Sequence, residues 1–198
     1  MTRRILVAGV GNIFLGDDGF GVEVARRLAE EELPAWVTVA DYGISGMHLA
    51  YDLGNSIAIV ILVDAAPRGG APGTVYVIEP QRQPDRGAPP AGAPPAGAPP
   101  AGAPPAATAP AGAARAGSQF ASAALFDGHG MQPDLVLGAA EMLGAQVSQM
   151  LVVGCEPAST EYGIGLNAPV AAAVPEAVRM VLGLIAAAGE RRVAGAGE

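Results

Sequence analysis

The sequence has few of the residues that build metal and redox sites. Its 198 residues include one cysteine, Cys155, and two histidines, one of which is His129. A single cysteine excludes an internal disulfide and a multi-cysteine zinc site, and two histidines exclude a three-histidine metal site. The chain also lacks the HExxH and G-x-S-x-G motifs, which disfavours ordinary zinc-protease and serine-hydrolase chemistry.

Positive charge and long apolar runs are also scarce. The chain has 11 Lys and Arg residues against 19 Asp and Glu residues, and its net charge is −8. Because phosphate groups bind clustered basic residues, a nucleic-acid partner is disfavoured. No run of about 18 large apolar residues predicts a transmembrane helix, and the start, MTRRILVAGVGN, has no cleavage-like site. We therefore expect a cytoplasmic protein without membrane insertion.

Short apolar runs alternate with helical patterns along the chain. Four parallel strands are predicted in RILVAGVG, WVTVADYG, IAIVILVDAAP and QMLVVGCEP. The segment GTVYVIEP follows the third of these too closely for a crossover helix, so we expect an antiparallel strand there. The pattern predicts an α/β fold: a three-layer α/β/α domain, phosphorylase/hydrolase-like, whose twisted five-stranded sheet is mostly parallel with one antiparallel strand.

Helices are predicted between these strands. They lie in DDGFGVEVARRLAEEEL, which Pro34 ends, in SGMHLAYDLGN with Ser45 as N-cap, in PDLVLGAAEMLGA, and in APVAAAVPEAVRMVLGLIAAAG. The residues expected to face inward in the last helix are Val174, Val178, Leu182 and Ile185.

A proline-rich tract interrupts the domain. Residues 80–118 hold most of the prolines of the chain and four successive GAPPA repeats. Such a tract lacks the large apolar side chains whose burial could offset its ordering entropy, so we expect it to be disordered. The predicted organisation is a single domain over residues 1–198, with a disordered surface insertion at about 80–118.

Two adjacent carboxylates, Asp17 and Asp18, follow the first predicted strand in GNIFLGDDGFG. In open α/β sheets, ligands bind beyond the carboxyl ends of the strands. If the first and third strands are neighbours, Asp18 and Asp64 face one crevice. A nucleotide-binding loop is the competing interpretation, but the G-x-G-x-x-G spacing fails here and the two carboxylates would repel a pyrophosphate.

The acidic pair suits a cation, because a helix N-terminus favours ionised carboxylates and metal ligands must be deprotonated. We predict that Asp17 is the N-cap of the helix and that Asp18 is a ligand. Asp64 ends an apolar strand, where it either faces an open cleft or makes an Asx turn. His129, in the loop FDGHGMQP, is a third candidate whose ring Asp127 could orient. Three such ligands are too few for a structural zinc and suit an ion that arrives already bound to a partner.

Several blocks of the sequence resemble the nickel-iron hydrogenase maturation endopeptidases. These blocks are GVGNIFLGDDGFG, DYGISGMHL, ILVDAAP, HGMQP, GCEP and YGIGLNAPV, and together they cover nearly all of the chain except residues 80–118. The resemblance implies that Asp18, Asp64 and His129 contact the metal and form the catalytic site. Asp18 stands where several members of the family carry Glu, so this ligand arm is one methylene shorter.

The resemblance also implies an activity. Family members remove a C-terminal extension from the hydrogenase large-subunit precursor after nickel insertion, so the cofactor is nickel supplied by the precursor, which is the expected partner. Three mechanisms are open at this stage: hydrolysis assisted by the metal, an aspartic dyad of Asp18 and Asp64, and a thiol nucleophile formed by Cys155 with His129. The rival function is a nickel-binding chaperone or sensor of hydrogenase assembly without proteolysis. The sequence leaves the oligomeric state open.

Overall fold

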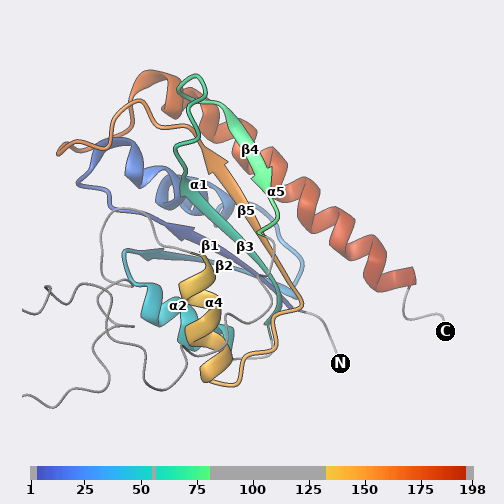
Figure 1. The fold of residues 1–198 in the computed structure, drawn as a ribbon. Coiled ribbons are helices and arrows are strands. Elements are labelled where there is room, and N and C mark those ends of the chain that lie inside the picture. Colours follow the sequence, from blue (N-terminus) through green and yellow to red (C-terminus); the bar gives the residue numbers. More distant parts are fainter. Residues whose placement is uncertain (1–3, 55–56, 81–132, 195–198) are drawn as a thin grey trace, which may run out of the picture.

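A five-stranded sheet forms the centre of the protein in the computed structural model, which describes residues 4–54, 57–80 and 133–194 (Figure 1). The strands are β1 (Arg4–Val10), β2 (Val37–Gly43), β3 (Ile57–Ala65), β4 (Val75–Ile78) and β5 (Gln149–Cys155). Their order across the sheet is β2-β1-β3-β5-β4. The pairs β1–β2, β1–β3 and β3–β5 are parallel, and β4 is antiparallel to β5. The predicted sheet, with its one antiparallel strand, is therefore confirmed.

Helices cover both faces of this sheet. They are the short 3-10 helix η1 (Gly16–Gly19), followed by α1 (Phe20–Leu28), α2 (Gly46–Leu53), α4 (Pro133–Met142) and α5 (Ala168–Ala194). Figure 1 shows α1 and α5 on one face and α2 and α4 on the other, and each pair of helices is in contact. This arrangement is the predicted three-layer α/β/α domain. The proline-rich tract lies almost wholly outside the described residues.

Each face of the sheet has its own apolar core, because neighbouring residues of a strand point to opposite faces. In β1, Ile5 and Val7 pack toward α1 and α5, whereas Leu6 and Ala8 pack toward α2 and α4. All four side chains are buried. This explains why the strands read as continuous apolar runs rather than alternating ones.

Helix α1 lies unusually close to the sheet at Gly21. A Cβ on this residue would overlap the carbonyl oxygens of Val10 and Val63, so only glycine allows the contact. The close approach holds η1 over the carboxyl ends of β1 and β3. One expectation about helix ends is wrong, because α1 ends at Leu28, well before Pro34. Ser45 is the N-cap residue of α2 as predicted, although its side chain makes no capping hydrogen bond.

The buried face of α5 is turned relative to the one predicted. Val174 and Ile185 are buried as expected, but Val178 and Leu182 are only partly buried. The fully buried stripe of the helix consists of Val170, Ala173, Val174, Ala177, Val181, Ile185 and Ala188. Small and medium apolar residues occur all around this helix, so packing against α1 and the sheet selects the face.

The segment of α5 from residue 168 to residue 191 is long enough and apolar enough to cross a membrane, judged by length and composition alone. In the fold, however, this helix covers the sheet and contributes to the core shared with α1. Core helices of globular proteins pass the same test, so the length of the apolar segment follows from its role in packing.

Candidate active site

Asp18 and Asp64 meet at the carboxyl edge of the sheet. Asp64 lies near the end of β3, and Asp18 lies in η1, which contacts β3. Both residues are only 7% exposed. Burial raises the pKa of Asp64 well above its usual range, the negative charge of Asp18 raises it further, and the backbone N–H of Ala65 lowers it in part. The structure thus brings together two of the three predicted site residues.

The loop between β1 and η1 is wrapped tightly around Asp18. The backbone N–H of Asn12 donates a hydrogen bond of 2.6 Å to Oδ2 of Asp18. Gly11 has a φ of 124°, and a Cβ there would overlap the carbonyl oxygen of Asp18. The glycines of this segment therefore serve a close backbone approach that positions a carboxylate, and no phosphate-binding geometry is needed to explain them.

Asp17 does not cap the following helix, and the prediction that it is the N-cap is wrong. Its carboxylate is fully buried and accepts hydrogen bonds from residues that precede α5. Oδ2 accepts hydrogen bonds from the backbone N–H groups of Ala158, at 2.8 Å, and Ser159, at 3.0 Å. Asn167 donates its backbone N–H to Oδ1 at 2.6 Å and its side-chain amide to Oδ2 at 3.1 Å. Asp17 therefore fastens η1 to the connection between β5 and α5.

This network keeps Asp17 ionised. Burial alone would raise the pKa of Asp17, but the hydrogen bonds from Asn167, Ser159 and Ala158 bring it below its usual value. The backbone continues the link, since the N–H of Gly16 donates to the carbonyl of Gly163 at 2.9 Å. The adjacent acids thus differ in role: Asp17 holds the loop, and the charge of Asp18 acts on Asp64.

Glu156 holds the chain around the site in place, a role that the sequence did not predict. It follows β5, is 5% exposed, and accepts the backbone N–H of Arg68 at 2.7 Å and that of Gly69 at 3.1 Å. The hydroxyl of Tyr76 also donates to it. These donors, foremost Tyr76, lower the pKa of Glu156 to about 2, although burial opposes them. The signals in the sequence were an acid directly after a buried strand and its place in the block GCEP.

Tyr76 links this carboxylate to the chain that follows Asp64. Its hydroxyl lies 3.0 Å from the carbonyl oxygen of Ala66, two residues after Asp64, and burial followed by Glu156 raises the pKa of the phenol. The guanidinium of Arg68 lies 5.9 Å from the ring centroid. Glu156 and Tyr76 therefore hold the segment on the carboxyl side of Asp64 in place.

Cys155 lies in the apolar core shared by α1 and α5, where its side chain is fully buried. Burial, followed by the negative charges of Asp17 and Glu156, raises the pKa of this thiol to about 11. A nucleophilic cysteine needs the thiolate form, which this environment disfavours at neutral pH. The structure therefore favours the packing role over the thiol mechanism.

The third predicted ligand, His129, lies outside the described residues, as does Asp127. Within residues 4–54, 57–80 and 133–194, no three His, Cys, Asp or Glu side chains converge as a metal-binding group. The geometry described is thus a pair of buried carboxylates at a sheet edge. Such a pair can share a proton or bind a cation.

The fold and the acid pair define an α/β protein with its site at the carboxyl edge of a mostly parallel sheet, and comparison with known proteins specifies the class. A sequence profile described as hydrogenase maturation protease matches residues 22–88. The hydrogenase expression/formation protein HupD of Rhodobacter capsulatus is 29% identical over 183 residues, which cover 89% of this chain and 70% of HupD. The hydrogenase 2 maturation protease of Escherichia coli is 37% identical over 82 residues, or 41% of this chain and 50% of that protein.

Solved structures agree with these sequence relatives. The hydrogenase maturating endopeptidase HybD from E. coli superposes with a TM-score of 0.63 at 27% identity, covering 94% of each chain. The hydrogenase 2 maturation peptidase from a Thaumarchaeota archaeon gives a TM-score of 0.59 at 26% identity, covering 93% of this chain and 99% of that one. The chain is therefore similar, in sequence and in fold, to the hydrogenase maturation proteases, a class of endopeptidases.

Proposed function

We propose that this protein removes the C-terminal extension of the large-subunit precursor of a nickel-iron hydrogenase after nickel has been inserted. The similarity to hydrogenase maturation proteases supports the reaction class and a hydrogenase precursor as the partner. The carboxylate pair at the sheet edge supports the placement of the reaction there. We propose the cytoplasm as the place of this reaction.

The proximity of two buried carboxylates is the observation that carries the metal part of this proposal. Asp64 is hard to ionise because it is buried and because Asp18 is close by. A divalent cation between the two groups would neutralise this repulsion and hold both in the ionised form. Asp18, Asp64 and His129 would then complete the coordination of a nickel ion that the precursor already holds. Only a loaded precursor would place its scissile bond at the site.

Two mechanisms of hydrolysis fit the pair. In the first, the nickel of the substrate orients water or polarises the scissile carbonyl, and a carboxylate or His129 carries the proton. In the second, Asp18 and Asp64 share one proton and act as an aspartic dyad without metal, as the raised pKa of Asp64 allows. We favour the first, because it would account for the proposed selection of a loaded precursor.

The test uses purified protein with a large-subunit precursor prepared with and without nickel. We expect cleavage only of the loaded precursor, and loss of cleavage in Asp18→Asn, Asp64→Asn and His129→Ala. Glu190→Gln is the control, because Glu190 is an exposed carboxylate near the C-terminal end of α5. Full cleavage of a folded nickel-free precursor would overturn the metal mechanism. Unchanged cleavage in all three site variants would overturn the site.

A nickel chaperone or sensor would use the same side chains without cutting a peptide bond. It would need to bind free nickel tightly, whereas a protease that meets the ion on its substrate binds free nickel weakly. Titration calorimetry with a nickel salt separates the two functions. A submicromolar site in the isolated protein, together with no cleavage of the loaded precursor, would favour the chaperone.

A further inference from the structure

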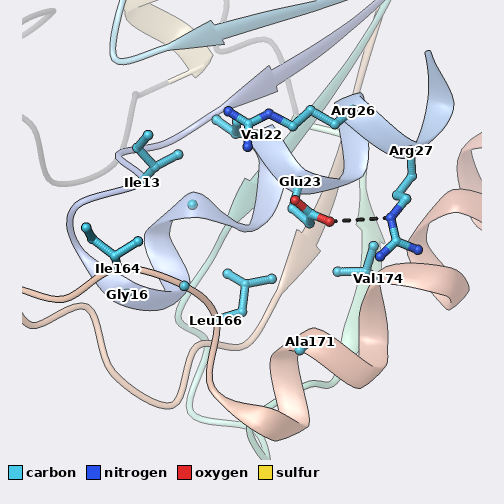
Figure 2. Close-up of a pocket in the computed structure, with 12 residues that line it drawn as sticks. Ile13, Gly16, Val22, Glu23, Arg26, Arg27, Ile164, Leu166, Ala171 and Val174 are labelled. Carbon is cyan, nitrogen blue, oxygen red and sulfur yellow. Dashed lines mark ion pairs between the residues drawn. The ribbon is translucent and has the colours of Figure 1, made fainter. Parts of the chain in front are cut away.

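A furrow with a cavity of about 320 Å³ opens between α1 and α5 (Figure 2). Its lining is mainly apolar: Val22 of α1, Leu166 from the connection before α5, and Val174 of α5. Figure 2 shows Ile13 and Ile164 at one end of the furrow, where they are 38% and 83% exposed. Exposed apolar side chains beside an apolar hollow are typical of binding surfaces.

The furrow starts at η1, the short helix that carries Asp18. Gly16 and Gly19, the first and last residues of η1, line it, and Asp18 lies between them. The turn that carries Asp18 therefore also forms the end of the furrow. A polypeptide that leaves the acid pair across η1 would enter the furrow between Ile13 and Ile164.

The furrow also carries an excess of positive charge in a chain whose net charge is −8. Glu23 and Arg27 form an ion pair at 3.4 Å. Arg26 makes no ion pair with any described residue, and Figure 2 shows its side chain running along α1 toward the Ile13 end. A ligand that complements the furrow therefore has an apolar side chain for its lining and a carboxylate that reaches Arg26.

We propose that the furrow binds the C-terminal extension of the precursor as an extended peptide. An apolar side chain of the extension fills the space lined by Val22, Leu166 and Val174, and a carboxylate of the extension pairs with Arg26. A second hollow of about 350 Å³ also borders Arg27 and Val174, so the furrow has room for several residues. This inference rests on the proposed function, since it assigns the segment that is cut off to a surface next to the site.

The apolar part is tested by filling the furrow at Ala171. Ala171 is exposed on the first turn of α5 and lines the furrow, whereas its exposed neighbour Ala172 does not. With nickel-loaded precursor as substrate, we expect Ala171→Phe to raise KM about tenfold and Ala172→Phe to change it less than about twofold. Circular dichroism melting would show that both variants fold.

The charged part is tested by reversal at Arg26. We expect Arg26→Glu to raise KM about fivefold, since an exposed attraction is replaced by a repulsion. Arg191→Glu is the matched control, because Arg191 is an exposed cation near the other end of α5. With a loaded precursor whose extension is shortened to its first few residues, the effect of Arg26→Glu should disappear.

The outcomes separate this proposal from the proposed function. If the wild-type protein does not cleave loaded precursor, the function itself fails. If it cleaves, and Ala171→Phe and Arg26→Glu behave like their controls, the furrow does not bind the extension. A concentration-dependent dimer in sedimentation that Ala171→Phe dissociates would assign the furrow to a second copy of this chain and overturn the proposal.

Discussion

Asp17→Asn should cost this protein a large part of its stability, although Asp17 contacts no substrate in our proposal. The substitution replaces one carboxylate oxygen with an amide nitrogen. Asn can still accept the 2.6 Å bond from the backbone of Asn167, but its nitrogen then faces the donors on Ala158, Ser159 and the side chain of Asn167.

The magnitude follows from the bonds lost. Hydrogen bonds to a charged group contribute about 1.5–3 kcal/mol each, and such losses within one network are not additive. We expect the free energy of unfolding to fall by about 3–5 kcal/mol, with a drop in Tm of about 10 °C. Urea unfolding at pH 7, followed by circular dichroism, measures the change. Asp41→Asn, at an exposed carboxylate, is the control and should cost less than about 0.5 kcal/mol.

The pH dependence gives a second check on the same reasoning. Folding lowers the pKa of Asp17, so its stabilisation is complete above its unfolded value of about 4 and is lost as the pH falls through the folded value. The difference between wild type and Asp17→Asn should therefore be full at pH 7 and shrink below about pH 4. A cost under about 1 kcal/mol at pH 7, or a cost independent of pH, would refute the anchoring role.

Three further predictions concern the packing around the site. Gly21→Ala should destabilise the protein by about 3 kcal/mol or more, because the added Cβ overlaps two strand carbonyl oxygens. Gly183 has open space around it, so the control Gly183→Ala should stabilise the protein by about 0.5–1 kcal/mol. Thermal melts measure both changes. The low pKa of Glu156 in the folded protein gives stabilisation that is lost as the pH falls from about 4.5 to 2. Glu156→Gln should therefore lose less stability than the wild type over this pH range. Urea midpoints across about pH 2–6 measure the difference. Cys155 should resist iodoacetamide at pH 8 until the protein unfolds, and Cys155→Ser should keep cleaving loaded precursor; loss of cleavage in a folded Cys155→Ser variant would restore the thiol mechanism.

Much of the fold could be read from local patterns. Continuous apolar runs, interrupted by glycine and by helical periodicity, were enough to predict five strands, one of them antiparallel, with a layer of helices on each face of the sheet. The nine residues between β3 and β4 left no room for a crossover helix, and that constraint alone determined the direction of β4. The pairing of Asp18 with Asp64 followed from general rules for open sheets, because the strands that precede them are neighbours.

Long-range contacts determined the rest. A double acid before a helix predicts an N-cap, but the partners of Asp17 lie 141 to 150 positions away in the chain, where no local pattern indicates them. Glu156 similarly binds donors 80 to 88 positions away. The inward face of α5 depended on contact with α1, because a helix rich in alanine and valine on every side has no strongly preferred face of its own. Hydrogen-bond donors and apolar faces are selected by what the folded chain places beside them, so these roles emerge only when distant segments meet.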